Sequence, residues 1–192
     1  MLDILTKSKI RQKIILLFLC NPKKEFYLSE IARAVETSAG TAQRELNRLL
    51  KSDLIVFKRK AGLNIYAVNS GYSLLGEVES IVKKTFGIEI ELKRELAKIK
   101  NISFAFLFGS YAKGGFKAES DIDLFVIGDV DEDQVFKAVR AIENIIKREI
   151  NYHITTRKEF SAKKKKNGFY KDILRDYVLL IGKNSEFRKF IK

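Results

Sequence analysis

The sequence predicts an α/β (α+β) chain built from two parts. Residues 1–70 follow the order helix, helix, helix and two short strands. Residues 101–192 alternate apolar strands with amphipathic helices, and a helical connector of residues 71–100 joins the two parts. The third observation is chemical: a Gly-Ser pair ends one apolar strand, and two aspartates one residue apart begin the next. We therefore expect a basic N-terminal module followed by a domain that carries the chemistry.

Composition limits the class of protein. Of 192 residues, 46% are hydrophobic, which is enough for a buried core. Lysine and arginine number 37 against 24 acidic residues, and the net charge of +13 favours polyanionic partners such as nucleic acid or nucleotides. The single cysteine, Cys20, cannot form an internal disulfide, and no apolar run approaches the ~20 residues of a membrane span. We expect a soluble, cytoplasmic protein with no membrane partner.

Three helices are expected at about residues 9–20, 28–35 and 39–51. Pro22 follows the first, and Ser38 has the side chain of an N-cap for the third. At 100° per residue, one face of the third helix is apolar. The opposite polar face holds Gly40, Gln43, Arg44, Asn47 and Lys51. The short turn between the second and third helices has helix-turn-helix spacing.

The stretch LIVFKRKAGLNIYAV alternates as a strand, turns at Ala61 and Gly62, and returns as a strand. Residues 8–69 thus resemble a winged helix-turn-helix. The resemblance implies that the third helix enters the major groove of double-stranded DNA and that the hairpin contacts phosphates. Gln43, Arg44 and Asn47 would read base edges. The basic residues of the hairpin are Lys58, Arg59 and Lys60. Winged helices also serve as dimerisation or protein-docking modules, so that alternative stays open.

The connector reads as one broken helix or two consecutive helices, with Gly87 as the interruption. Its apolar positions are sufficient to pack against both sides of a junction. The same positions would also suit the seam of a homodimer, and the sequence does not decide between these roles.

The Gly-Ser pair follows the apolar strand SFAFLF. Gly109 permits a close turn into a helix that starts near Ser110, and the free backbone N–H groups of such a helix attract phosphate. In the next strand, DIDLFVI, Asp121 and Asp123 project to the same face because side chains alternate. Two carboxylates so placed repel each other unless a cation lies between them, and Mg²⁺ or Mn²⁺ suits all-oxygen ligands that bridge to substrate phosphates.

The joint pattern G-S-x-A-x-G followed by S-D-I-D-L resembles the nucleotidyltransferase superfamily of DNA polymerase β, in its minimal branch. The resemblance implies a small mixed sheet flanked by helices, with Asp121 and Asp123 holding divalent metals. It also implies binding of a nucleoside triphosphate and in-line attack of a hydroxyl on its α-phosphate. The residues expected to bind the nucleotide are Gly109, Ser110, Lys113 and Ser120. Lys117 could also neutralise phosphate, or both lysines could simply be exposed.

The family normally has a third carboxylate on a later strand, which here is REINYHITT. The matching position is Asn151, whose amide can coordinate through oxygen but brings no charge and is no useful base. Glu149 and His153 are expected on the same alternating face, so either could replace the missing carboxylate. The third catalytic residue is therefore the point at which this chain departs from the family.

The tail is expected to form a helix, a second helix and a short strand, YVLLI. The basic run of residues 163–166 is typical of a solvated helix face, with a nucleic-acid backbone as the alternative. The chain as a whole is similar to prokaryotic proteins in which a winged helix is joined to a nucleotidyltransferase domain.

Two functions follow from these resemblances. In the first, the protein is an enzyme that transfers a nucleoside monophosphate to a hydroxyl acceptor, directed or autoregulated by its winged helix. Related minimal transferases act as antitoxins that modify a partner toxin, so a small partner protein is among the acceptors. In the second, the protein is a DNA-binding regulator whose transferase domain is an inactive nucleotide sensor.

Overall fold

The structure is a computed structural model that describes residues 7–60, 62–114, 121–164 and 167–192. The chain forms two compact units. The first comprises Met1–Ile88 and Asn144–Lys147, and the second comprises Glu89–Glu143 and Arg148–Lys192. The domain boundaries expected from the sequence, at residues 70 and 100, stay predictions. Within the described ranges, none of the helices combines the length and the apolar character needed to cross a membrane.

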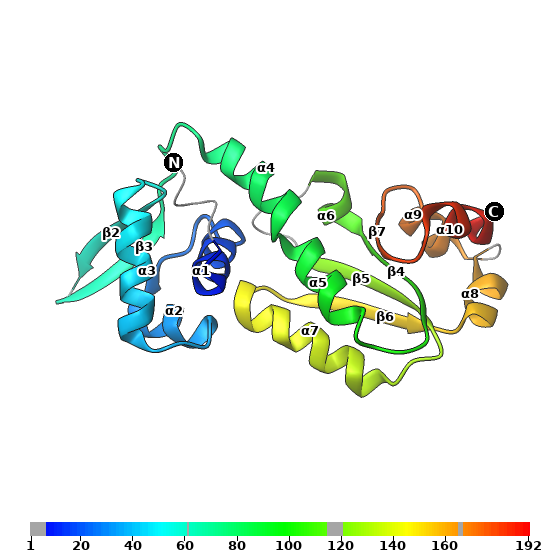
Figure 1. The fold of residues 1–192 in the computed structure, drawn as a ribbon. Coiled ribbons are helices and arrows are strands. Elements are labelled where there is room, and N and C mark those ends of the chain that lie inside the picture. Colours follow the sequence, from blue (N-terminus) through cyan, green and yellow to red (C-terminus); the bar gives the residue numbers. More distant parts are fainter. Residues whose placement is uncertain (1–6, 61, 115–120, 165–166) are drawn as a thin grey trace. The chain divides into compact units, whose positions relative to one another are not determined.

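The first unit packs helices against a small antiparallel sheet of strand order β1-β3-β2 (Figure 1). Its elements are α1 (Lys9–Leu19), β1 (Phe26–Tyr27), α2 (Leu28–Ala34), α3 (Ala39–Lys51), β2 (Ile55–Lys60), β3 (Leu63–Val68) and α4 (Leu75–Thr85). The three helices and the two longer strands follow in the expected order, whereas the short strand β1 between α1 and α2 was not expected.

Helix α3 begins where the sequence predicts. The Ser38 hydroxyl accepts a hydrogen bond from the Thr41 backbone N–H, which satisfies one of the free donors of the first turn. The apolar face is fully buried at Ala42, Leu46 and Leu49. The predicted N-cap and the predicted inward face are therefore both confirmed.

A buried ion pair joins α1 to α3, and the helix pattern gave no sign of it. Nε of Arg11 donates to Oε2 of Glu45 at 2.6 Å, and both side chains are almost completely buried. The Ser8 hydroxyl donates to Oε1 of Glu45 at 3.2 Å, and Arg48 donates to the same oxygen at 3.3 Å. Glu45 therefore shares its charge among three donors.

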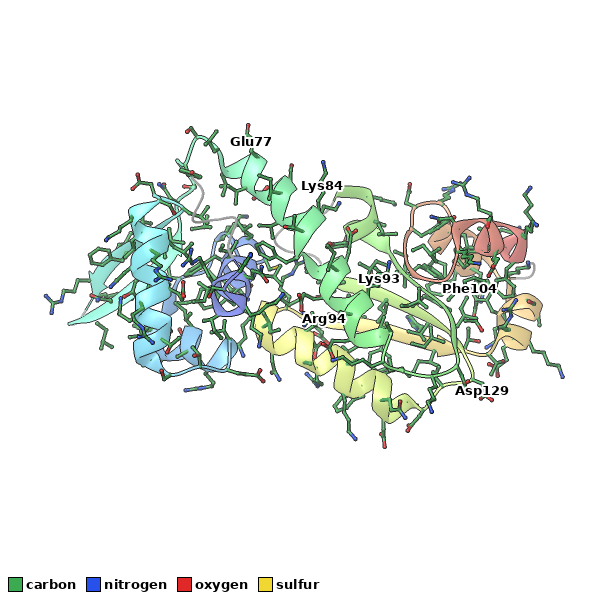
Figure 2. The ribbon with its side chains drawn as sticks, in the orientation of Figure 1. Glu77, Lys84, Lys93, Arg94, Phe104 and Asp129 are labelled. Atoms are coloured by element: carbon green, nitrogen blue, oxygen red, sulfur yellow. The ribbon has the colours of Figure 1, made fainter. Side chains whose placement is uncertain are left out.

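The connector contains two helices, as expected, and Gly87 separates them. Helix α4 ends at Thr85, and α5 (Ile88–Leu96) starts after two intervening residues. A Cβ atom on Gly87 would lie 2.8 Å from the Cα atom of Lys83, so a larger residue does not fit this turn. Figure 2 labels Glu77 and Lys84 on α4, and Lys93 and Arg94 on α5.

The second unit contains a mixed four-stranded sheet of order β6-β5-β4-β7. Strand β4 is antiparallel to β5 and β7, whereas β5 and β6 are parallel and joined through α7. This unit therefore has the small mixed sheet with helices that the sequence predicted. Its elements after α5 are β4 (Ile102–Phe108), α6 (Gly109–Gly114), β5 (Ile122–Gly128), α7 (Glu132–Ile146), β6 (Ile150–Thr155), α8 (Arg157–Lys163), α9 (Gly168–Ile173), β7 (Val178–Ile181) and α10 (Asn184–Ile191).

One face of this sheet is covered by an aromatic core. Alternate side chains of β4 and β5 project to that face, and the rings of Phe106 and Phe125 stack at 5.3 Å between centroids. Phe104, labelled in Figure 2, lies 5.0 Å from Phe187 of α10. Helices α8 and α9 add Phe160 and Tyr170. The intervening side chains of both strands are also buried, and Figure 1 shows α5 and α7 alongside the sheet.

Two features of the tail differ from expectation. Helix α10 follows β7, where no further element was expected, and it is held by Phe187 and Phe190 at helical spacing. The basic run, described as far as Lys164, is not simply a solvated face. Lys164 Nζ donates to the Phe190 carbonyl and lies 5.4 Å from the centre of that ring. Lys164 therefore contacts α10 and is partly buried.

Candidate active site

The turn after β4 brings the Gly-Ser pair to one end of the sheet. Gly109 has a φ of +68°, a conformation that only glycine adopts without strain. A side chain does not fit at this position, because a Cβ atom on residue 109 would lie much closer than 3.0 Å to Oδ2 of Asp123. Ser110 is exposed on the first turn of α6, and Lys113 is exposed on its last. The predicted role of Gly109 in a close turn thus has a structural basis.

Strand register places polar residues predicted for the site side by side at this end. Asp123 pairs with Phe108 across the antiparallel β4 and with Asn151 across the parallel β6. Asp121 precedes the strand and is exposed, whereas Asp123 is half-buried. The Asn151 amide donates to Oδ2 of Asp121 at 3.4 Å. Two carboxylates and one amide therefore gather within one small region.

The environment of Asp123 disfavours its charge. Burial raises the pKa of this carboxyl, and the neighbouring charge of Asp121 raises it further. His153 and a hydrogen bond from Asn151 act in the opposite direction, but the net shift is upward. A bound cation would offset both causes of the rise.

His153 lies on the same face of β6 as Asn151, two residues further along, as expected from alternation. Its ring lies 5.9 Å from Phe125, 6.3 Å from Phe108 and 5.7 Å from Phe169, centroid to centroid. The imidazole ring, stacked on Phe125, thus borders the aromatic core. This aromatic neighbourhood could not be read from the sequence, because Phe169 comes from α9.

Glu149 lies at the start of the strand that carries Asn151. Strand β6 starts at Ile150, so Glu149 precedes it by one residue, as Asp121 precedes β5. Its side chain is exposed, and its carbonyl accepts a hydrogen bond from the Ile122 backbone N–H at 3.3 Å. Of the two proposed replacements for the third carboxylate, His153 lies within β6 on the face of Asn151, and Glu149 lies just before the strand.

The donor set fits a magnesium or manganese ion in its chemistry. Asp121, Asp123 and the amide oxygen of Asn151 provide the hard oxygen ligands that Mg²⁺ takes. Within the described residues, no group of three or more His, Cys, Asp or Glu side chains is arranged to hold a metal, so any ion here would need substrate or water ligands as well. Ser120 and Lys117, two further predicted contacts, lie outside the described residues.

The residues expected to contact DNA lie on α3 and β2. Arg44 and Asn47 are exposed, and Lys58, Arg59 and Lys60 form the exposed end of β2 next to the turn. Gln43 is less free than predicted. Its amide donates to Asn47 at 2.8 Å and accepts from the Tyr66 hydroxyl at 3.0 Å, so α3 is tied to β3 through this side chain.

Comparison with known proteins identifies the class of the second unit. The chain belongs to the family Polymerase beta, Nucleotidyltransferase, which matches residues 91–186, half of its length. It is 62% identical over 29 residues to the putative protein adenylyltransferase MJ0604 of Methanocaldococcus jannaschii. That match covers 15% of this chain and 29% of the relative, so the chain spans less than a third of the curated protein it resembles.

Two solved structures are also similar. A toxin-antitoxin crystal structure with AMP-PNP matches with a TM-score of 0.42 and 19% identity, over 54% of this chain and 81% of that chain. The toxin-antitoxin MntA-HpeT mutant D39ED41E matches with a TM-score of 0.40 and 15% identity, over 54% and 80% of the two chains.

Proposed function

We propose that this protein is a nucleotidyltransferase that binds a nucleoside triphosphate with Mg²⁺ and transfers the nucleoside monophosphate to a hydroxyl acceptor. The observation that carries the proposal is the packing of Gly109 against Asp123. This packing lies inside the stretch that matches the family, and it joins the turn that would bind phosphate to the carboxylates that would bind metal.

Asp121 and Asp123 would hold the divalent ion, with Asn151 as a neutral third ligand. A metal in this position supplies charge neutralisation for the triphosphate and for the leaving pyrophosphate. Burial and the neighbouring charge of Asp121 raise the pKa of Asp123, and a bound cation would relieve the repulsion between the two carboxylates.

The protein's own groups would bind and orient the substrates. The N–H groups after Gly109 and the hydroxyls of Ser110 and Ser120 would hold the phosphates, and Lys113 would add positive charge. Asn151 cannot remove a proton from the acceptor. We therefore assign proton removal to His153, which shares its strand face, or to the solvent.

The relative's name guides the choice of substrate. Because the matching stretch belongs to a putative protein adenylyltransferase, we propose ATP as the donor and a protein hydroxyl as the acceptor. A small partner protein fits this description.

We propose that the first unit is a winged helix-turn-helix that binds double-stranded DNA. The order of its helices and strands, the exposed Arg44 and Asn47, and the basic end of β2 support this role. DNA binding would direct the transferase or regulate its own gene.

A second function is favoured by one observation, the amide at position 151. If the missing carboxylate abolishes turnover, the protein is a DNA-binding regulator whose second unit senses nucleotide. In that case triphosphate binding would change DNA affinity, and no acceptor would be labelled.

Calorimetry with ATP tests the nucleotide site. We expect binding with Mg²⁺ and a loss of at least about tenfold in affinity with chelator, because Asp121 and Asp123 otherwise repel the phosphates. The double variant Asp121→Ala, Asp123→Ala should behave like the chelated protein. Asp129→Ala is the matched control, since Asp129 is an exposed aspartate just beyond the other end of β5. Equal affinity in all four experiments would overturn the proposal.

A further inference from the structure

Strand β7 forms an edge of the mixed sheet. Among the described strands it pairs with β4 alone, so its other side presents backbone N–H and C=O groups without a strand partner. Such an edge is a template for another extended segment. It is four residues long, which limits an added strand to a similar length.

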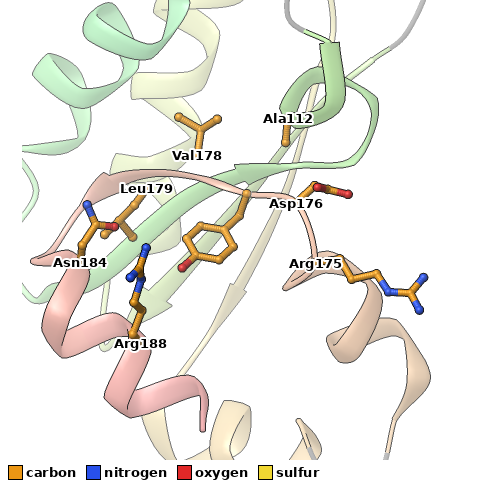
Figure 3. A pocket seen from close by; sticks show the side chains of 8 residues that line it. Ala112, Arg175, Asp176, Val178, Leu179, Asn184 and Arg188 are labelled. Carbon is orange, nitrogen blue, oxygen red and sulfur yellow. The ribbon is translucent and has the colours of Figure 1, made fainter.

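A cavity of about 630 Å³ lies along β7, between α6 and α10 (Figure 3). None of the residues assigned to the candidate nucleotide site is among those that line it. Ala112, which lines it, follows Ser110 by two residues, and two residues on a helix point about 200° apart. The lining residues are Ala112, Arg175, Asp176, Tyr177, Val178, Leu179, Asn184 and Arg188.

The charges of the cavity are distributed along the strand. Figure 3 shows Arg175 beside the start of β7, and Asn184 and Arg188 toward its other end. Both arginines are exposed, and neither forms an ion pair within the described part of the chain. Asp176 is the acidic residue of the lining. Figure 3 shows the Arg188 side chain directed toward β7 and the Arg175 side chain directed away from it, so Arg175 would have to turn toward a ligand on the strand. The two arginines outnumber the one aspartate of the lining.

We propose that β7 binds an extended acidic segment of a partner protein, which adds to the sheet as a strand. The backbone of the segment would pair with the free edge of β7, and its carboxylates would accept hydrogen bonds from Arg175 and Arg188. Leu179 and Val178 would supply apolar contact between these two ends.

The charges disfavour a second copy of this chain. Antiparallel pairing of two β7 strands would bring Arg175 of one copy toward Arg188 of the other, and like charges repel. A nucleic acid would meet the arginines but has no peptide backbone to pair with the strand edge. The proposal concerns binding alone and does not rest on nucleotide transfer, so its failure is independent of the transferase assignment.

Titration of the isotope-labelled full chain with a blocked peptide tests the proposal. The glutamate peptide alternates valine and threonine and carries glutamates at both ends. The lysine peptide has the same sequence with lysines in place of the glutamates. We expect amide shifts and slower hydrogen exchange along Val178–Ile181 with the glutamate peptide, weakening with salt, and no response to the lysine peptide.

The double variant Arg175→Glu, Arg188→Glu should lose about tenfold or more in affinity for the glutamate peptide and gain binding of the lysine peptide. A misfolded protein would not gain a ligand, so the reversal separates charge recognition from damage. Lys137→Glu is the control, because Lys137 is exposed on α7 and does not line the cavity. The proposal fails if the amides of β7 do not respond, if both peptides bind equally, or if a single-stranded oligonucleotide binds there in preference to the peptide.

Discussion

The backbone of Gly109 lies directly against the carboxylate of Asp123. The antiparallel register explains this contact, because Phe108, the residue before Gly109, pairs with Asp123 across the sheet. The turn that would hold phosphate and the carboxylate that would hold metal are therefore one structural unit. Any side chain at position 109 must move the aspartate.

Gly109→Ala should damage both stability and binding. The positive φ alone costs about 1–2 kcal/mol of unfolding free energy for a residue with a Cβ atom, and the collision with Asp123 displaces the carboxylate. Thermal unfolding and ATP calorimetry measure the two effects. Gly168→Ala is the matched control, since nothing lies within 4 Å of a Cβ atom there. Equal behaviour of the two variants would show that the close contact does not matter.

Asn151→Asp should raise the transfer rate by about tenfold or more, because it supplies both a charged metal ligand and a base. Triphosphate affinity in Mg²⁺ should change less, since the groups expected to hold phosphate are untouched. The measurement is pyrophosphate release with cell extract as the source of acceptor. Without metal, the same variant should be less stable than the wild type, because a third carboxylate then lies beside Asp121 and Asp123.

Pyrophosphate release by single variants also distinguishes His153 from Glu149 as the group that replaces the missing carboxylate. If His153 already removes the proton, the wild type is active, Asn151→Asp gains little, and His153→Ala abolishes turnover while Glu149→Ala does not. A protein that binds ATP but labels no acceptor, before or after Asn151→Asp, is a regulator and not an enzyme.

Replacement of Arg44 by alanine should weaken binding to a specific DNA site by about 1–3 kcal/mol, as for a lost base-edge contact. Alanine at Lys58, Arg59 and Lys60 should instead lower affinity for every sequence and flatten its salt dependence. Selection from random duplexes, followed by titration at several salt concentrations, measures both. Lys137→Ala serves as a control outside the first unit. If no duplex is preferred, the unit is a docking module.

Glu45 should make the first unit sensitive to acid. Burial raises the pKa of Glu45, but the hydrogen bond and charge of Arg11, with Ser8 and Arg48, outweigh burial and hold it below the usual 4.5. A depressed folded-state pKa means that the ionised carboxylate contributes stability above about pH 4.5, and this contribution is lost as the pH falls through the folded-state pKa.

Glu45→Gln should therefore lower the free energy of unfolding by about 1–3 kcal/mol at neutral pH and reduce its loss in acid. Denaturant titrations between neutral and acidic pH measure both changes. Glu25→Gln is the control, since Glu25 pairs with Lys58 at the surface and should matter little. An unchanged pH profile in Glu45→Gln would contradict the assignment.

Local patterns predicted most of the fold. The Ser38 cap, the inward face of α3 and the interruption at Gly87 depend on residues within one or two turns, so they can be read along the chain. The resemblance to a known family predicted that Asn151 would lie near Asp121 and Asp123, and the register of β5 and β6 places it beside Asp123.

Contacts between distant segments could not be predicted in this way. The Arg11–Glu45 pair joins residues 34 positions apart, and a charged residue within a helix pattern is ordinarily read as exposed. Phe169, which contacts His153, comes from a separate helix. Helix α10 has eight residues, two of them basic, so its apolar pattern is too short to predict a helix from the sequence. Each miss depends on tertiary packing, which a single sequence encodes only indirectly.

Because side chains alternate along β5, mutations in the core of this strand can also disturb the candidate site. Asp123 and Phe125 share one face of the strand, so the register that aligns the carboxylate with Asn151 is the same register that places Phe125 in the aromatic core. A slip of one residue would lose both together. Random mutagenesis with selection for loss of nucleotide binding should then recover two kinds of variant. Substitutions of the aspartates should abolish binding at every growth temperature. Substitutions of core phenylalanines, which do not contact the ligand, should abolish binding only at high temperature.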